Sequence, residues 1–392
     1  MSLSRRSLIA SGAAGLAGLA LSACGRTGGQ AGPSAGSSEG PESPSASASS
    51  ASQAPGVALQ DISTVPHLFF HSLVADPQRA FDGDDQQAGY LDYMVTIPEF
   101  RKIIAELHRR DFQLVTPHQL LRAEADGRVT TLHPEITRGK KPLILSFDDL
   151  SYYEYMDGDG FAQNVTLHDG ELTCTYTDAA GKTTTGEYDY VPILERFVAE
   201  HPEFSHAGAK GTVALTGYNG ILGYRTSEIS YGQENRNIRR DQETARTVAQ
   251  AMKDRGWEFA SHSWGHLNFT QEGVANLEAD TRKWKAEVEP LVGPTDLLIY
   301  PFGADIAGVE PYTDANPKVR MLTQQGFHAF FNVDASQVAW WQIQPTTIRA
   351  NRINVDGISL KAAIDGDNDV LQHFFDPRAV LDPARPASIA GS

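Results

Sequence analysis

Two pairs of side chains that could take part in metal chemistry each follow an apolar segment. Asp148 and Asp149 come directly after residues 143–147 (LILSF), and His262 and His266 follow residues 257–261 (WEFAS). Adjacent buried carboxylates repel each other, and a bound cation removes this conflict by taking one as a ligand and leaving the other as a base. Two imidazoles and a carboxylate suit a divalent ion with positions open for water and substrate. A solvated acidic pair or a helix cap is the simpler explanation of the two aspartates.

The segments around these residues predict repeated strand–helix units. Thr96 and Glu99 form a capping box before an amphipathic helix, and further helical patterns cover residues 192–200 and 274–288. Fully apolar strands that alternate with helices favour a parallel barrel or a doubly wound sheet, with the active site at the carboxyl ends of the strands. The predicted strands are residues 67–70, 113–115, 143–147, 212–215, 257–261, 297–301, 327–331 and 347–353.

One segment departs from this pattern. Between residues 164 and 190 apolar and polar residues alternate, and Asp169-Gly170 and Ala180-Gly181 are turn signals. This favours an inserted antiparallel hairpin or meander within an insertion at about residues 155–190.

Three motifs resemble those of the polysaccharide deacetylases, the NodB-homology domains of carbohydrate esterase family four. They are SFDD at 146–149, HSWGH at 262–266 and YPFG at 300–303, and the resemblance covers roughly residues 60–360. It implies a distorted parallel (β/α) barrel, with Asp148 as catalytic base and a metal, usually zinc, on Asp149, His262 and His266. It also implies that the backbone N–H of Phe302 stabilises the oxyanion.

A fourth element lies near the N-terminus. Residues 65–72 (VPHLFFHS) resemble the opening of the poly-N-acetylglucosamine deacetylases, whose catalytic histidine has moved to the first strand by circular permutation. The resemblance assigns the general acid to His71. His373, in the C-terminal region, is the competing candidate.

Two positions depart from the family pattern. Leu150 follows the two acids where the family has glycine, and Ile299 stands where the family has an arginine that orients the base. Arg352 or Arg225 could supply that charge, and the sequence does not select between them.

Several aromatic and amide side chains are candidates for sugar binding. Flat aromatic faces can stack on sugars, and Gly-rich loops allow a close approach to a ligand. A plain loop is the alternative explanation of residues 216–226, and Trp264 could instead orient the histidine loop. The candidates are Tyr218, Asn219, Tyr224, Trp264 and Tyr300.

The expected function is metal-dependent hydrolysis of N-acetyl groups on an amino sugar polymer, with release of acetate. A glycosidase would use two separated carboxylates and need no histidine pair. A metal-dependent amidohydrolase would normally carry H-x-H, which this chain lacks. The alternative from another class is a lipid-anchored polysaccharide-binding protein that has lost catalysis.

The N-terminal region resembles an export signal. Arg5 and Arg6 precede a short apolar run, and residues 21–24 (LSAC) resemble a lipobox, so residues 1–23 are expected to be a twin-arginine signal peptide. An ordinary signal with a chance cysteine is the alternative. Residues 24–58 are expected to be a disordered tether rich in small and polar residues, and residues 59–392 the catalytic domain.

The charge and the cysteines limit the expected partners. The net charge of −16 disfavours nucleic acid and anionic lipid as partners, so membrane attachment is expected through an acyl group on Cys24 alone. Cys174 is the other cysteine, and no intrachain disulfide is expected.

Replacing the lipobox cysteine tests the anchor. Cys24→Ala is expected to release the protein from the membrane fraction or to block its maturation, because acylation requires the thiol. Fractionation followed by immunoblotting measures this. Unchanged membrane retention in the variant would exclude a lipid anchor at Cys24.

Overall fold

The computed structural model describes residues 55–386. The predicted signal peptide, Cys24 and nearly all of the predicted tether lie outside these residues. Gly56–Ala58 form β1, which pairs antiparallel with β6 (Glu135–Thr137), so the last residues predicted as tether belong to a strand instead. Among the helices of residues 55–386, none combines the length and the apolar character needed to cross a membrane.

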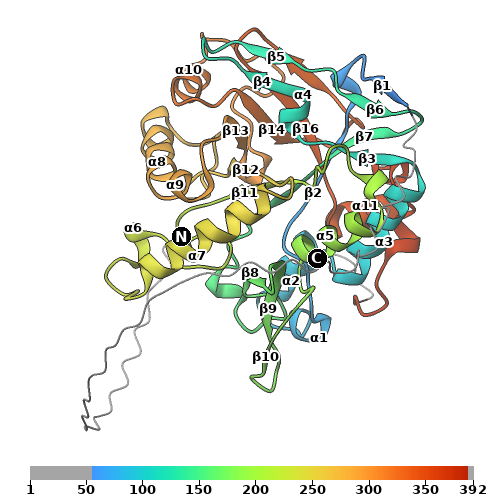
Figure 1. Cartoon of the computed structure of the whole chain (residues 1–392), viewed down its shortest axis with the longest axis vertical. Helices are drawn as coiled ribbons and strands as arrows, with labels where there is room; N and C mark the ends of the chain where they lie inside the picture. The colour runs from blue at the N-terminus through green and yellow to red at the C-terminus, as the bar shows by residue number, and fades with distance from the viewer. Residues whose placement is uncertain (1–54, 387–392) are drawn as a thin grey trace, which may run out of the picture. The chain divides into compact units, whose positions relative to one another are not determined.

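The central feature is a closed barrel of seven parallel strands (Figure 1). Around the barrel, the strands are β2 (His67–Phe70), β7 (Lys141–Asp148), β11 (Thr212–Leu215), β12 (Glu258–Ser261), β13 (Leu297–Ile299), β14 (Ala329–Val333) and β16 (Ile348–Asn354). Each strand pairs with the next, and β16 pairs with β2 to close the barrel. The distorted parallel barrel is therefore confirmed.

The strand predicted at residues 113–115 has a different place. It forms β3 (Phe112–Leu114), which pairs with the first residues of β7, whereas β11 pairs with the last residues of β7. β3 therefore flanks the base of the barrel and does not close it. Short strands add to the edges: β4 (Leu121–Ala123) pairs with β5 (Val129–Thr131), and β15 (Trp341–Ile343) pairs with β16.

Alternation along the strands determines which side chains enter the barrel. Ile144, Ala214, Ala260, Ile299 and Phe331 form one buried cluster, in which alanine leaves room for the larger residues of neighbouring strands. Continued to the carboxyl end of β7, the same alternation turns Ser146 and Asp148 inward. The barrel interior is thus apolar at its base and polar at its carboxyl end.

Helices cover the outside of the barrel. Figure 1 shows α7 (Ile238–Lys253) and α8 (Val274–Glu287) on one side, and α3 (Ile97–Arg109) and α11 (Gly357–Asp365) on the other. α3 begins with the predicted capping box, in which Glu99 accepts a hydrogen bond of 2.8 Å from the Thr96 N–H. α7 was not predicted, because it buries small residues such as Ala245 and Ala249 in an otherwise charged sequence. The remaining longer helices are α5 (Tyr190–Glu200) and α10 (Pro317–Gln324).

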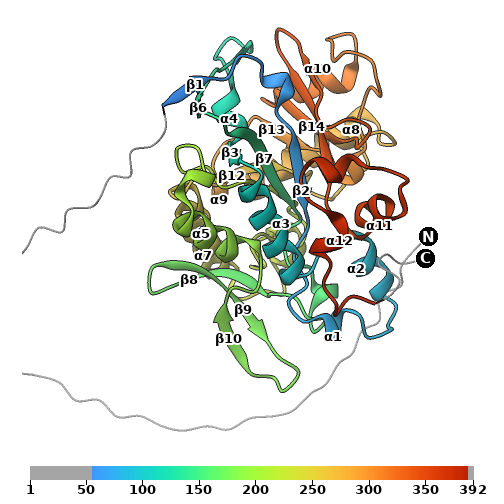
Figure 2. The same ribbon diagram turned by 90° about the vertical axis from the view of Figure 1, so that its right-hand side faces the viewer.

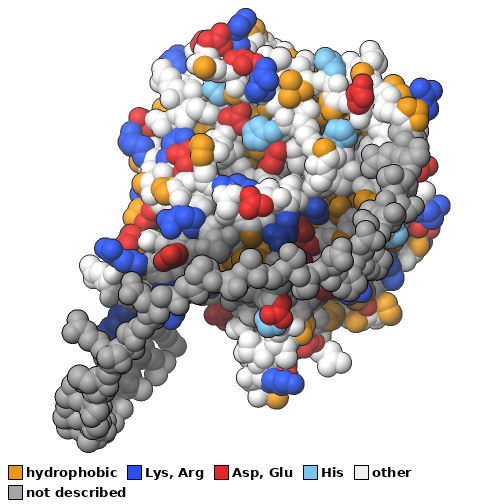
Figure 3. All heavy atoms as spheres, viewed as in Figure 1, with side chains coloured by type: hydrophobic (Ala, Val, Ile, Leu, Met, Phe, Trp, Pro, Cys, Tyr) orange, Lys and Arg blue, Asp and Glu red, His pale blue; other side chains and the backbone are white. Residues whose placement is uncertain are grey.

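The predicted insertion is an antiparallel meander. β8 (Asn164–His168), β9 (Glu171–Thr177) and β10 (Thr183–Gly186) pair in sequence and extend from the body of the domain in Figure 2. The first turn has positive φ at Asp169 and Gly170, as the turn signal predicts. On β9, Leu172, Cys174 and Tyr176 are buried, so one face of the meander packs on the domain. On the face shown in Figure 3, acidic and basic side chains are interspersed.

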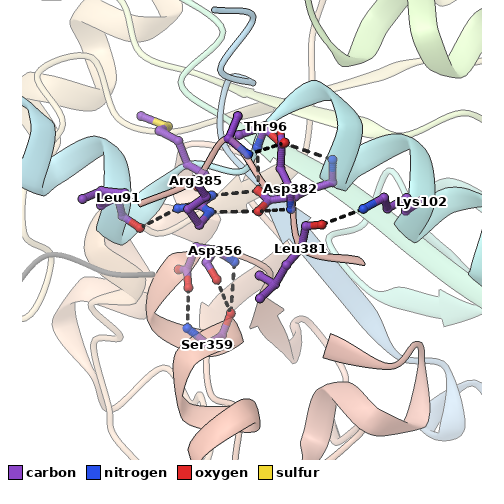
Figure 4. A network of polar contacts seen from close by, with 11 residues as sticks. Leu91, Thr96, Lys102, Asp356, Ser359, Leu381, Asp382 and Arg385 are labelled. Carbon is purple, nitrogen blue, oxygen red and sulfur yellow. Dashed lines mark hydrogen bonds and ion pairs between the residues drawn. The ribbon is translucent and has the colours of Figure 1, made fainter. Parts of the chain in front are cut away.

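A buried ion pair fastens the C-terminal segment to α3 (Figure 4). Arg385 donates from Nε and Nη2 to the two carboxylate oxygens of Glu99, both at 2.8 Å, and both side chains are almost completely buried. Arg385 also donates to the carbonyl oxygens of Leu91 (3.2 Å) and Met94 (2.8 Å). These contacts hold the end of α2 (Gln87–Tyr93), which carries Tyr93.

Removal of this arginine should destabilise the domain. Arg385→Met leaves Glu99 buried without its cation and is expected to lower the free energy of unfolding by about 3–5 kcal/mol. Arg101→Met is the control, because Arg101 pairs with Glu187 at the surface and its removal should cost about 1 kcal/mol or less. Urea denaturation of both variants measures the difference, and equal losses would contradict the assigned role of Arg385.

Candidate active site

The residues predicted for catalysis and metal binding line one cavity of about 370 Å³ at the carboxyl end of the barrel. They come from segments up to about 230 residues apart in the chain, and parallel strands bring them together because their carboxyl ends meet at one rim. The predicted site residues that line this cavity are His71, Asp148, Asp149, His262, His266 and Phe302.

Three of these side chains form a ligand set. One ligand atom each from Asp149, His262 and His266 lies within 4.8 Å of the others, and His266 Nε2 is 3.6 Å from Asp149 Oδ2. The His262 Nδ1 lies 2.8 Å from the carbonyl oxygen of Ile299, which can only accept, so Nδ1 carries the proton and Nε2 is free to bind a metal. Two imidazole nitrogens and one carboxylate oxygen fit zinc.

Electrostatics favour the neutral imidazole that a metal ligand requires. Burial lowers the pKa of His262, and the negative charges of Asp148 and Asp149 oppose this only in part. Because a metal binds the unprotonated nitrogen, little proton displacement is needed at this residue near neutral pH.

The loops that present these groups have unusual backbone conformations. Asp149, Ser263, His266 and Phe302 all have positive φ, between 53° and 65°. Non-glycine residues adopt this region at a cost, and such residues cluster at functional sites. Gly303, beside Phe302, also has positive φ, and a Cβ there would lie 2.4 Å from Val333, so the third motif requires glycine.

Neighbouring side chains hold the ligands in place. The Tyr153 hydroxyl donates to Asp149 Oδ1 at 2.5 Å and lies 2.9 Å from Thr216 Oγ1, which leaves Asp149 Oδ2 on the side of His266. Asp280 accepts from the backbone N–H groups of Trp264 and Gly265, both at 2.7 Å, and so fixes the histidine loop.

Asp148 is held by Arg352. The guanidinium forms two hydrogen bonds to the carboxylate, of 2.7 and 2.9 Å, and Arg352 is fully buried over the ring of Phe69. Burial alone would raise the pKa of Asp148, but the positive charge and the hydrogen bonds of Arg352 outweigh this effect and lower the pKa to about 2. Asp148 is therefore ionised at neutral pH, as a base must be.

Of the two arginines considered from the sequence, Arg352 is the one beside Asp148. Arg225 instead donates to the carbonyl oxygens of Ser151, Tyr152 and Asn219 and supports the loop after β7. Ile299, where the family has arginine, is buried in the apolar barrel interior. The charge therefore comes from a different strand.

His71 and His373 occupy different places. His71 follows β2, lines the cavity, and its Nδ1 lies 3.1 Å from the carbonyl oxygen of Tyr93, which leaves Nε2 available. Burial raises the pKa of Asp356, another cavity residue, and the charge of His71 opposes this rise. His373 lies beside Pro66, Phe112 and Pro142, at the starts of strands and thus at the opposite end of the barrel.

The residues predicted for sugar binding do not line the cavity. Tyr300 is completely buried, and its hydroxyl accepts a hydrogen bond from Tyr312 in the core. Tyr224 and Asn219 use their polar atoms within the loop: Tyr224 donates to the Val165 carbonyl, and Asn219 bonds Glu154 and Tyr231. Tyr224 and Asn219 are thus held in the loop that follows β11 and Tyr300 is held in the core, and none of the three lines the catalytic cavity.

Trp264 and Tyr218 have supporting positions. The Trp264 indole donates to Glu287, and a Cβ on Gly217 would lie 2.2 Å from the Trp264 ring, so glycine makes room for it. The Trp264 carbonyl accepts from the N–H groups of Gly217 and Tyr218. Trp264 thus orients the histidine loop, which was the alternative interpretation. Tyr218 stacks on Tyr153, at a centroid distance of 5.5 Å.

Other apolar side chains surround the cavity. Tyr93, Tyr155, Phe302 and Ile358 all line it and are between 43% and 67% exposed. Of these, the sequence motifs predicted only Phe302, and that for its backbone N–H. Asn354 and Asp356 in the cavity were also missed, although their place at the end of an apolar strand was a usable signal.

Replacing Arg352 should shift the pH dependence of activity. Without the Arg352 guanidinium, less positive charge opposes the effect of burial on Asp148. The pKa of Asp148 should therefore rise, by roughly 1 to 3 units. A base works only when ionised, so the acid limb of the pH profile of kcat/KM should move to higher pH in Arg352→Met. Arg352→Lys, which keeps the charge, should show a smaller shift, and Arg225→Met none. An unchanged acid limb in Arg352→Met would contradict the assignment.

The chain has limited similarity to known proteins. No family model and no curated protein matches the chain. Among solved structures, the deacetylase PplD of Streptococcus pyogenes in complex with acetate is 14% identical, with a TM-score of 0.41 over 82% of this chain and 100% of that one. A Mycobacterium smegmatis protein assigned as a polysaccharide deacetylase is 17% identical, with a TM-score of 0.26 over 42% and 45%.

Proposed function

We propose that this protein is a metal-dependent deacetylase that hydrolyses N-acetyl groups on an amino sugar polymer and releases acetate. One observation carries the proposal: an ionised carboxylate, a three-residue ligand set and a separate imidazole meet in a single cavity. Each of these groups has a distinct role in amide hydrolysis, and the three motifs that supply most of them resemble those of the polysaccharide deacetylases.

The chain's own groups account for the proton transfers. Bound by Asp149, His262 and His266, a zinc ion would supply Lewis acidity and lower the pKa of water. Asp148, kept ionised by Arg352, accepts the proton of the attacking water. The Phe302 N–H is the donor proposed for the oxyanion, and His71 as imidazolium protonates the departing amine.

The rim of the cavity supports a carbohydrate substrate. Exposed apolar side chains grouped around one cavity are typical of ligand-binding grooves, and sugars present flat apolar faces that stack on aromatic rings. Tyr155 is half exposed and stacks on Tyr153, with a centroid distance of 5.5 Å, which limits its motion. Tyr93 and Phe302 lie at other points of the same rim.

The site is complete although two positions differ from the family pattern. Leu150 is fully buried in the main core, and the charge missing at Ile299 is supplied by Arg352. A polysaccharide-binding protein without catalysis remains the second candidate, and acetate release distinguishes the two.

The N-terminal motifs support a location outside the cytoplasm, on the bacterial membrane, so a cell-surface or extracellular polymer is the proposed substrate. The acidic net charge supports no role for nucleic acid.

Substitution of two histidines tests the division of roles. His71→Ala is expected to lower acetate release from an N-acetylglucosamine oligomer by about 10² to 10⁴ while the protein keeps its zinc. His266→Ala should lose both activity and zinc, because it removes a ligand. Acetate assay and metal analysis of the same samples provide the two measurements.

His373→Ala is the matched control and should change neither quantity. Full activity in His71→Ala combined with loss in His373→Ala would overturn the assignment of the acid. Absence of acetate release from wild-type protein with bound zinc, across N-acetylated glycans, would favour the binding protein.

A further inference from the structure

A second cluster of metal-ligating side chains lies outside the cavity. His108 is in the last turn of α3, His201 is the C-cap of α5, and Glu203 is in the short helix η3 (Pro202–Phe204). One ligand atom from each lies within 4.8 Å of the other two. We propose that these three residues form a second, structural site for a divalent transition metal such as zinc.

The distances are compatible with one shared ion. His108 Nε2 is 2.7 Å and His201 Nδ1 is 3.9 Å from Glu203 Oε1. Tetrahedral ligands with bonds of about 2.0–2.1 Å lie roughly 3.3 Å apart, so a small rotation of the Glu203 side chain away from His108 and toward His201 makes the two separations equal. Nitrogen donors select zinc, nickel or copper over magnesium and calcium, which prefer oxygen.

The surroundings favour a cation here. The negative ends of the dipoles of α3 and α5 both point at the cluster, because His108 and His201 lie at the C-termini of these helices. The two imidazole rings are 4.4 Å apart between centroids, so a shared ion satisfies both nitrogens where two protonated rings would repel. Phe197 and Phe204 pack against the rings and form an apolar wall.

The position of the cluster indicates its role. η3 lies beside β3 at the base of the barrel, where the Glu203 carbonyl accepts a hydrogen bond of 3.1 Å from Gln113. This is the end opposite the catalytic cavity. An ion bound there would join α3 to α5 and η3, whose ligands lie about 90 residues further along the chain. It would stabilise the packing of these helices rather than take part in hydrolysis.

Zinc titration of the full chain tests the site separately from catalysis. The protein carrying His262→Ala and His266→Ala lacks two of the cavity ligands. It is first stripped of metal with a chelator and then dialysed to equilibrium against zinc, and it is expected to bind about one zinc per chain. Adding His201→Ala should remove this zinc, and so should the near-isosteric Glu203→Gln, which limits any effect on folding. His168→Ala, at an exposed histidine on β8, is the control and should retain it.

Thermal unfolding gives a second readout. Zinc should raise the melting temperature of the cavity double variant and of the His168→Ala control, because binding to the folded state stabilises it, but not that of the His201→Ala or Glu203→Gln proteins. The proposal is overturned if the cavity double variant binds no zinc, or if its zinc persists after both His201→Ala and Glu203→Gln. Either result leaves the proposed deacetylase activity unaffected.

Discussion

The ion pair between Arg352 and Asp148 is the interaction on which the active end of the barrel depends. It connects β16 to β7 across β2, and both partners are buried inside the barrel. A buried carboxylate without a partner would take up a proton and could not act as a base. A buried guanidinium without a partner would destabilise the fold. Each residue therefore offsets the cost of burying the other's charge, and the pair keeps an ionised carboxylate beside the ligand set.

This arrangement gives the two adjacent aspartates different orientations and different partners. Asp148 faces inward and is held by an arginine, whereas Asp149 has positive φ and turns toward His266, with one oxygen held by Tyr153. Two neighbours in sequence thereby acquire different environments from a single change in backbone direction at the end of β7. The same principle applies at the histidine loop, where Asp280 and Trp264 hold the backbone between His262 and His266.

Much of this could be predicted from local sequence patterns. The apolar strands, the α3 capping box and the meander all depend on short-range periodicity and turn residues, and each is present. The cavity residues that belong to the three motifs were instead identified through the resemblance to the deacetylase family, because each motif is a short contiguous segment. Arg352 was only one of two candidates, because its contact with Asp148 spans 204 positions and leaves no local signal. The rim residues Tyr93 and Tyr155 lie at the end of α2 and in the short helix η2 (Glu154–Met156), whose positions depend on tertiary packing.

The chain enters the domain at the end of the barrel that lies away from the cavity. β1 pairs with β6, just before the start of β7, so Pro55 and the residues next to it lie at the base of the barrel. Figure 2 shows β1 and α2 at opposite ends of the domain, and α2 carries Tyr93 of the cavity rim. A fusion partner or a surface linkage placed before Pro55 would therefore be joined to the domain at the base of the barrel. The rim of the cavity, at the other end, stays clear of that point of attachment and remains open to a long polymer.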